Sequence, residues 1–405
     1  MSNIVFLFGA GVSRPANMPM TDDITEQILT ARNVVRGSND AYYIVAEPDL
    51  PRFQIMTEDF VPRVKQVVEY LSRLPRIYDE PPSSSSYNYE QIYFKAHEIL
   101  NTILRNKLNP MFKPSADFIS KEFDDLLGPL QPGDLLTWDP EKLFNETTKY
   151  IADIVRSMLW RPKSRLDHMS LLKGAFLDQG IDGITVATLN HDLLFEFYFK
   201  YNEIPFNDGF ELQEQEVEFW ESKKLFNESK VRLLKLHGSI NWYSFEVERE
   251  EFNDYIVGKL NYGSFFLNAD IPGINKSPLP NHALIIVGTN NKILEYHKYI
   301  FFDLQVQFFL QLRETSELFV SGYAFGDEWI NRMILDWMRS NSTASIVIAH
   351  DDFEGLINGI DGFFSEWLKI WQNDRRLGVI HKMIQHVTWE EIKETFAYLE
   401  SQRTI

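Results

Sequence analysis

Four short segments of the chain carry polar residues or glycines that could do chemistry. Glycine lets a backbone approach a diphosphate closely, and a histidine beside it is placed to exchange protons near neutral pH. Each segment directly follows a run of apolar residues, so all four are expected at the ends of strands. The segments are Gly9-Ala10-Gly11-Val12-Ser13, Thr188-Leu189-Asn190-His191-Asp192, His237-Gly238-Ser239 and Ser321-Gly322-Tyr323-Ala324-Phe325-Gly326-Asp327.

The first segment fits a phosphate-binding turn between a strand and a helix. Gly9 and Gly11 would let backbone amides reach a diphosphate, and Ser13 could add a hydroxyl donor. The third glycine of the usual dinucleotide-binding fingerprint is missing. A tight strand–helix turn without any ligand is therefore the alternative for these residues.

The second and third segments supply an amide, a carboxylate and an imidazole. Asn190 and Asp192 are two residues apart, so both could face one cavity in an extended turn. Either could instead cap the helix expected to follow at Leu193. His237 at a strand terminus is placed to act as a base, although a lone histidine can also be structural. The other histidines show no ligand spacing, and we predict no metal site.

The fourth segment predicts a glycine turn followed by a helix that Asp327 caps. The last apolar run of this part of the chain then ends at His350-Asp351-Asp352. Carboxylates at that place could hydrogen-bond a ribose or simply face solvent.

Short β-rich runs that alternate with helical patterns must position these segments. Such alternation is typical of βαβ units. It predicts an α/β fold with a Rossmann-like, doubly wound parallel sheet, whose ligands bind where strands end. The expected strands are Ile4–Phe8, Ile184–Thr188, Val231–Leu236, Ala283–Val287, Glu317–Ser321 and Ser345–Ala349, with Leu377–Ile380 as a further candidate. One expected helix begins near Asp23. The other expected helices cover 297–313, 327–340, 353–373 and 389–402.

Residues 31–170 follow a different pattern, with three long stripes of apolar residues at helical spacing. This block predicts a large helical insertion, in which Pro81-Pro82-Ser83-Ser84-Ser85-Ser86 is a solvated linker or loop. We therefore expect one Rossmann domain made of residues 1–30 and 171–352, interrupted by the insertion and followed by a helical tail at 353–405.

Composition excludes several classes of protein. The 405 residues are 44% hydrophobic, enough for a large buried core, and a net charge of −18 disfavours direct contact with nucleic acid. The absence of cysteine excludes disulfides, thiolate nucleophiles and cysteine-ligated zinc or iron–sulfur clusters. The first residues contain no basic leader, and the apolar runs are about half as long as a bilayer crossing needs. We expect a cytoplasmic protein without a membrane segment.

In this order, Gly-Ala-Gly-x-Ser, Thr-x-Asn-x-Asp and His-Gly resemble the NAD-binding core of the sirtuin superfamily. The Gly-Tyr-Ala-Phe-Gly-Asp stretch is similar to that of the bacterial sirtuin-like branch in particular. The resemblance covers residues 1–30 and 180–352, and leaves out the helical insertion and the tail.

The resemblance implies a role for each matched residue, with NAD as the substrate and no metal. Asn190 would hold the water or the ribose at the anomeric carbon, and His237 would be the general base. The competing candidate for the adenosine side is Val287-Gly288-Thr289. The implied cofactor-binding residues are Gly9, Ala10, Gly11 and Ser13 at the diphosphate and nicotinamide ribose, Asp192 at the carboxamide with Thr188 in the same motif, and Gly322 and Tyr323 on the adenosine side.

Two departures from the sirtuin pattern bear on the reaction. Sirtuin deacylases carry glutamine where this chain has Leu189. They also carry a four-cysteine zinc ribbon after the His-Gly pair, whereas residues 242–280 contain no cysteine. Because that module helps to form the acyl-peptide cleft, the resemblance favours hydrolysis of NAD over protein deacylation.

The resemblance therefore implies an NAD glycohydrolase that releases nicotinamide and ADP-ribose, in antiphage defence by NAD depletion. The layout is most similar to the sirtuin-like subunits that work beside a HerA-type DNA-translocase ATPase. We accordingly expect a homo-oligomer that is gated by assembly with such a partner, which would make the DNA contact. A module that senses NAD or ADP-ribose without turnover is the alternative, followed by a deacylase or ADP-ribosyltransferase.

Overall fold

The computed structural model describes residues 2–37, 40–46, 54–74, 88–124, 138–160, 166–212, 217–247, 254–260, 274–278, 283–287, 299–360 and 363–402. None of the helices in this part of the chain combines the length and the apolar character that a bilayer crossing requires.

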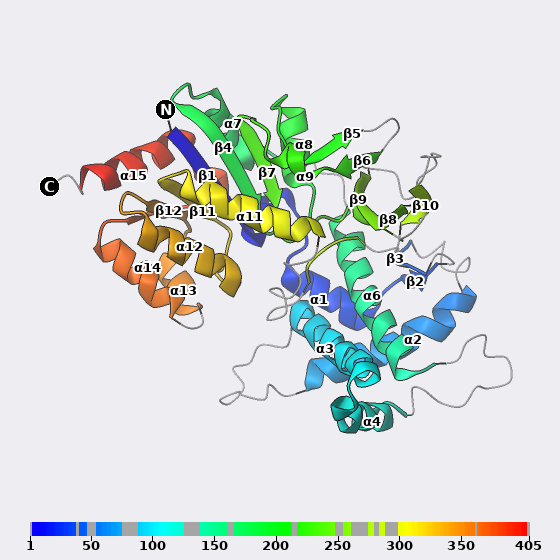
Figure 1. Cartoon of the computed structure of the whole chain (residues 1–405). Coiled ribbons are helices and arrows are strands. Elements are labelled where there is room, and N and C mark those ends of the chain that lie inside the picture. The colour runs from blue at the N-terminus through cyan, green and yellow to red at the C-terminus, as the bar shows by residue number, and fades with distance from the viewer. Residues whose placement is uncertain are drawn as a thin grey trace.

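A six-stranded parallel sheet forms the centre of the fold (Figure 1). Its strands are β1 (Ser2–Phe8), β4 (Ile181–Thr188), β7 (Val231–Lys235), β11 (Glu317–Ser321), β12 (Ser345–Ala349) and β13 (Leu377–Ile380). Their order is β13-β12-β11-β1-β4-β7, so the chain proceeds from β1 to one edge and later returns to build the other. The order reverses between β1 and β11, which is where doubly wound sheets bind their ligands. The predicted Rossmann-like, doubly wound α/β fold is confirmed.

Helices cover both faces because the strands are apolar on both sides. In β1, Ile4, Phe6 and Phe8 point into one core, and Val5 and Leu7 into the other. The first core is closed by α1 (Thr21–Thr30), α7 (Ser170–Leu177), α8 (Leu194–Tyr201) and α15 (Trp389–Ser401). The second is closed by α11 (Tyr299–Arg313), α12 (Glu328–Ser340), α13 (Phe353–Asn358) and α14 (Phe364–Asn373).

The block between α1 and α7 is mainly helical, as predicted. Its helices are α2 (Gln54–Arg73), α3 (Tyr89–Leu108), α4 (Lys113–Glu122) and α6 (Pro140–Leu159). The apolar stripes did not predict the hairpin of β2 (Val34–Arg36) and β3 (Tyr42–Ile44), because strands of three residues are too short to show a period. Arg36 and Tyr42 join this hairpin to α6 through 2.9 Å hydrogen bonds to Glu146. The predicted linker at 81–86 lies outside the described residues.

A second, five-stranded sheet was not predicted, and it stands beside α6 at the right of Figure 1. Its order is β10-β8-β9-β6-β5, and its neighbouring strands are antiparallel. The strands are β5 (Phe210–Leu212), β6 (Val217–Trp220), β8 (Trp242–Val247), β9 (Asp254–Leu260) and β10 (Ile274–Pro278).

The predicted strand Ala283–Val287 is wrong. This segment makes one isolated bridge, between Ile285 and Gly238. Its extended backbone instead pairs with the turn after β7, where the amide of Ile286 donates to the carbonyl of His237 at 2.8 Å. An apolar run of this length indicates burial, but its pattern cannot tell a sheet strand from an extended segment packed on a turn.

Two helix boundaries also differ from the prediction. The first helix begins at Thr21, and Asp23 lies in its first turn, accepting a hydrogen bond from the backbone of Met20 at 2.8 Å. The single helix predicted at 353–373 is divided into α13 and α14, while Leu377–Ile380 is confirmed as a strand. The remaining short elements are η1 (Ala10–Ala16), η3 (Pro110–Phe112), η4 (Asp167–Met169), α9 (Ser222–Leu225) and η5 (Ile384–His386).

Candidate functional site

The glycine turns after β1 and β11 lie against each other at the point where the strand order reverses. The amide of Gly11 donates to the carbonyl of Gly322 at 3.0 Å, and the amide of Gly9 to that of Ser321 at 3.1 Å. A Cβ atom on Gly9 would lie 2.4 Å from the Gly322 carbonyl oxygen. Gly322 itself has a φ of +65°. The contact between the two turns thus requires these glycines even without a ligand. A tight turn without a ligand was the alternative left open for the segment 9–13.

The Thr-Leu-Asn-His-Asp turn after β4 connects directly to the first glycine turn. The side-chain amide of Asn190 donates to the carbonyl of Gly9 at 3.0 Å and to Ser13 Oγ at 2.9 Å. Ser13 Oγ in turn donates to Asp192 Oδ2 at 2.6 Å. Thr188 Oγ1 accepts from the amide of Asn190 at 3.1 Å. The fold thereby joins two predicted segments that are about 180 residues apart in the chain into one buried network.

Asp192 contacts both the start of α8 and the polar cluster. Its Oδ1 accepts from the amide of Leu194 at 3.0 Å, at the start of α8, while its Oδ2 faces Ser13. The two oxygens of one carboxylate serve different partners here. The N-cap residue of α8 is Leu193 and makes no side-chain capping bond, so the predicted cap by Asn190 or Asp192 is wrong, although Asp192 does contact the first residue of the helix.

His237 contacts a partner that the sequence did not identify. Its Nε2 lies 2.9 Å from Asp327 Oδ2, and both side chains are 4% exposed. Oδ1 of the same carboxylate accepts from the amides of Trp329 and Ile330 and caps α12, as predicted. The capping pattern was visible in the sequence, but nothing in the spacing of residues 90 apart could indicate the pair.

Tyr323 turns inward within its own loop. Its hydroxyl donates to Asn331 Oδ1 at 2.9 Å and accepts from the amide of Asp327 at 3.2 Å. Burial, followed by the nearby charge of Asp327, raises the pKa of the Tyr323 hydroxyl well above its ordinary value. The side chain stiffens the loop that positions Asp327, and the backbone of Gly322 and Tyr323 is the part that faces the first glycine turn.

The predicted residues thus gather at the carboxyl edge of β1, β4, β7 and β11. Thr188, Asn190, Asp192, His237 and Tyr323 are all buried. Gly9 and Ser13 are buried too, Gly11 is half-buried, and Ala10 is exposed. Gly288 and Thr289 of the competing adenosine-side candidate lie outside the described residues. After β12, Asp352 accepts from the amide of Gly355 at 2.9 Å and caps α13.

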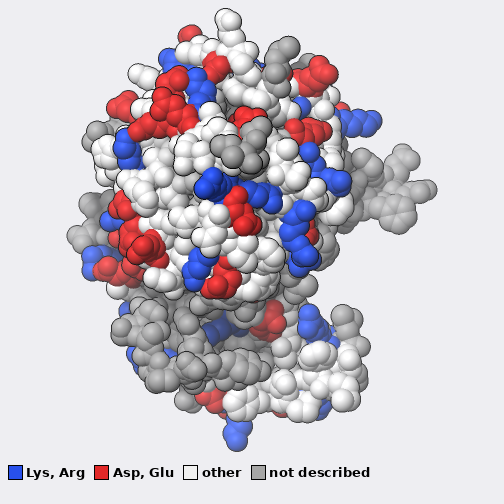
Figure 2. All heavy atoms as spheres, turned by 90° about the vertical axis from the view of Figure 1, so that its left-hand side faces the viewer, with Lys and Arg blue, Asp and Glu red and all other residues white. Residues whose placement is uncertain are grey.

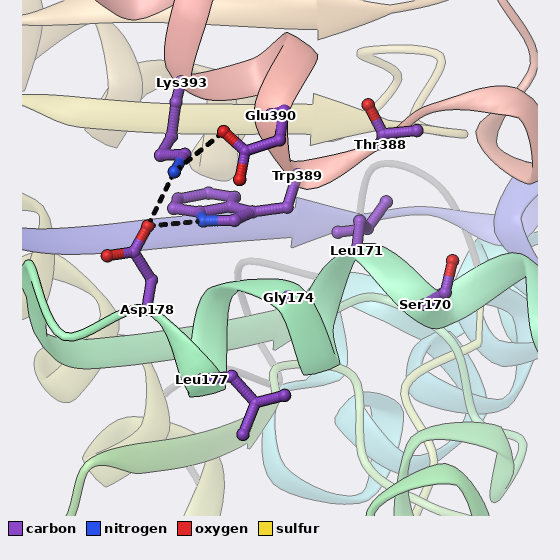
Figure 3. A pocket seen from close by; sticks show the side chains of 9 residues that line it. All are labelled: Ser170, Leu171, Gly174, Leu177, Asp178, Thr388, Trp389, Glu390 and Lys393. Carbon is purple, nitrogen blue, oxygen red and sulfur yellow. Dashed lines mark hydrogen bonds and ion pairs between the residues drawn. The ribbon is translucent and has the colours of Figure 1, made fainter.

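A surface cavity of about 570 Å³ lies between α7 and α15, and none of the predicted residues lines it (Figure 3). At its floor Asp178 accepts from Lys393 Nζ at 2.9 Å and from Trp389 Nε1 at 2.8 Å. Those two donors and the amide of Gly180 lower the pKa of the Asp178 carboxyl to about 2. The lining residues are Ser170, Leu171, Gly174, Leu177, Asp178, Thr388, Trp389, Glu390 and Lys393.

Within the described ranges, no group of three or more histidine or acidic side chains is arranged to hold a metal ion. The polar groups at the carboxyl edge are instead bonded to one another. The arrangement can orient a polar ligand and exchange a proton through His237.

Residues 184–367 match the family model of the SIR2-like domain. This stretch is similar to the SIR2-like domain. The SIR2-like stretch runs from β4 into α14 and includes Asn190, His237 and Gly322, so the predicted resemblance to the sirtuin superfamily is confirmed there. The glycine turn after β1 precedes it.

The solved structures that match the chain include two Sir2 homologues. One is a complex with NAD, with 10% identity, a TM-score of 0.34, and coverage of 99% of this chain and 90% of that one. The other is a mutant in complex with ADP-ribose, with 11% identity, a TM-score of 0.32, and coverage of 100% and 94%. No curated protein matches the chain.

Proposed function

We propose that this protein is an NAD glycohydrolase, which cleaves NAD to nicotinamide and ADP-ribose. The observation that carries the proposal is the meeting of Asn190, Ser13 and Asp192 in one hydrogen-bonded cluster at the switch point of a doubly wound sheet. His237 lies in the turn after β7, at the same edge. The SIR2-like match over 184–367 supports NAD as the ligand.

The chemistry needs few groups. The nicotinamide–ribose bond breaks through an oxocarbenium-like state, as in glycoside hydrolysis, and the leaving group is already a cationic pyridinium. No general acid is therefore required. Asn190 positions the water or the ribose, and His237 accepts a proton from water or a ribose hydroxyl. Asp327 holds the His237 ring through the 2.9 Å contact, as an orienting carboxylate does for a histidine base.

Two negative groups favour the developing positive charge. Asp192 lies in the Asn190 cluster, and Asp327 contacts the base. Both side chains are buried, where charges are poorly screened and act more strongly than in water. On this proposal Asp192 also binds the nicotinamide carboxamide, and the glycine turn at 9–13 binds the diphosphate.

The test is to incubate the purified chain with NAD and to follow nicotinamide release, alone and with a HerA-type ATPase. Asn190→Ala and His237→Ala should each lower the rate by roughly 10²- to 10⁴-fold. Asn358→Ala and His386→Ala, at exposed positions of α13 and η5, are the matched controls and should keep full activity. Full activity in the two site variants would refute the assignment.

We also propose that the activity serves antiphage defence in the cytoplasm and is gated by assembly. A constitutive NADase would poison its own cell, so control has to come from a second component. The helical insertion and the large apolar side chains exposed on α11, Phe302 at 56% and Leu310 at 39%, are surface that an assembly could cover. A homo-oligomer with an ATPase partner that contacts DNA also fits a net charge of −18.

A second candidate is a module that senses NAD or ADP-ribose without turnover. The observation in its favour is that Asn190 already donates its side-chain amide to two protein acceptors, Gly9 and Ser13. Such a module would be stabilised by the ligand, because the ligand binds the folded state. It would show a ligand-dependent rise in melting temperature and release no nicotinamide with any partner.

A further inference from the structure

A buried lysine lies beneath the turn that carries Asn190. Lys235 is the last residue of β7, two residues before His237, and its side chain is 1% exposed. Its Nζ lies 2.8 Å from Glu196 Oε1 and 2.7 Å from Ser239 Oγ. It also donates to the backbone carbonyl of Asp192.

These contacts reach the Asn190 turn, α8 and the segment after the His-Gly pair. Glu196 lies in α8, which begins where the Asn190 turn ends. Ser239 follows the His-Gly pair and donates onward to Asn241 at 2.7 Å. Each of Lys235's three ammonium protons thus has an acceptor, in three different segments.

The charge of Lys235 is balanced by one carboxylate. Glu196 Oε1 accepts from Lys235, whereas Glu196 Oε2 is buried without a hydrogen-bond partner among the described residues. A buried ammonium and a buried carboxylate are costly alone and are tolerated when paired and hydrogen-bonded. A neutral side chain would satisfy the same space without this cost, so the presence of the pair needs a reason.

We propose that Lys235 is a positioning residue for the Asn190 turn. An ammonium can donate to a carboxylate, a hydroxyl and a carbonyl at once, and it thereby sets the orientation of the peptide at Asp192. That orientation determines where the neighbouring Asn190 side chain points. The inference deepens the proposed NAD hydrolysis and rests on it, because Asn190 is the residue that holds the reacting groups.

Backbone hydrogen bonds hold this turn on both sides of Asn190. The carbonyl of His191 accepts from the amide of Ile240 at 3.0 Å, and the amide of Leu189 donates to the carbonyl of Phe8 at 3.0 Å. Lys235 adds a bond to the carbonyl of Asp192, which follows Asn190 in the chain, whereas the bond to Phe8 is made by Leu189, which precedes it. Lys235 thus adds a side-chain contact at Asp192 to a turn that the backbone holds at Leu189 and His191.

The experiment compares a variant that lacks both charges with one that keeps the Lys235 ammonium and replaces its carboxylate partner by an amide, whose oxygen can still accept a hydrogen bond from Lys235 Nζ. Lys235→Met/Glu196→Gln removes both charges at similar volume, whereas Glu196→Gln keeps Lys235 and its bond to the Asp192 carbonyl. The double variant should lower kcat for nicotinamide release by roughly 10- to 100-fold, as misplacement by about an ångström does, with KM changed less than about 3-fold. Glu196→Gln should keep kcat within about 3-fold of the parent.

Hydrogen–deuterium exchange gives a readout that does not depend on activity. In the double variant, exchange should rise in residues 189–193 and not in β1 or β12, and in Glu196→Gln it should not rise. Parental kcat with parental exchange in the double variant would overturn the proposal, as would an equal kcat loss in both variants. If the parent releases no nicotinamide under any condition, the proposed function fails, and the exchange difference alone decides the role of Lys235. Lys235→Gln/Glu196→Gln replaces the first pair if that pair does not fold, and the same outcomes decide.

Discussion

At the scale of single residues, one carboxylate connects the predicted base to a helix. Asp327 Oδ1 accepts from two amides at the start of α12, and Oδ2 contacts His237. The buried Tyr323 hydroxyl donates to Asn331 Oδ1 and accepts from the amide of Asp327, and these two bonds hold the same loop. The position of the imidazole is therefore set by elements far from it in the chain.

Asp327→Asn should separate the two duties of this residue. Asparagine keeps an oxygen that can cap α12, but it removes the negative charge beside His237. We expect kcat for nicotinamide release to fall by roughly 10²-fold, within the range of acid–base groups, while the melting temperature changes little. Asp352→Asn makes the same change at the exposed cap of α13 and is the control. Equal activities of these two variants would contradict the pairing as a functional contact.

The carboxyl group of Glu317, at the start of β11, should make the free energy of unfolding depend on pH. Burial, followed by the nearby charge of Glu400, raises the pKa of the Glu317 carboxyl to about 7. The folded chain holds this proton more tightly than the unfolded chain, whose value is near 4.5. Stability from this group is therefore full below about pH 4.5 and is lost as the pH rises through 7.

The variant Glu317→Gln should remove that dependence. Its unfolding free energy should match the parent near pH 5 and exceed it at pH 8, by at most about 3 kcal/mol. Urea unfolding at the two pH values measures this difference. The exposed Glu394→Gln is the control and should follow the parent at both. A constant difference between Glu317→Gln and the parent across this range would contradict the raised pKa.

At the scale of elements, the contact between the turns after β1 and β11 organises the candidate site. A Cβ atom on Gly322 would lie 2.5 Å from the amide nitrogen of Val12, at a φ of +65°. A Cβ on Gly326, four residues later in the same loop, would meet nothing within 4 Å. Gly322→Ala should therefore lower the unfolding free energy by about 1–3 kcal/mol, and Gly326→Ala should change it little. Chemical denaturation compares the two, and equal losses would show that the contact is not tight.

The strands of the parallel sheet could be predicted from the sequence, whereas those of the antiparallel sheet could not. All six parallel strands were predicted, because a strand buried on both faces leaves an unbroken apolar run. The antiparallel sheet at 210–278 was missed, because its strands are half-buried, and their pairing depends on contacts along 70 residues. The apolar segment Ala283–Val287 was misassigned for a related reason, since its partner is the turn at 237–242.

At the scale of the whole molecule, charge opposes association. The net charge is −18, although Figure 2 shows acidic and basic side chains interspersed on the face that it presents. Repulsion between like-charged copies is screened by salt, with a Debye length of about 10 Å at 0.1 M. If the chain forms homo-oligomers, their fraction should rise between about 0.05 and 0.5 M salt. Mass photometry or sedimentation checks this, and a single 47.5 kDa species at every concentration and salt level would contradict the proposed oligomer.

The sequence by itself determined the fold class, the order of the central strands' motifs and the residue types at their carboxyl ends. These properties are local, because burial on two faces and glycine turns leave their mark within a few neighbouring residues. Only the tertiary structure decided that Asn190 bonds Ser13, that His237 contacts Asp327 and that Lys235 donates to the carbonyl of Asp192. Those contacts join residues that are distant in the chain, and their geometry follows from how the strands are ordered in the sheet.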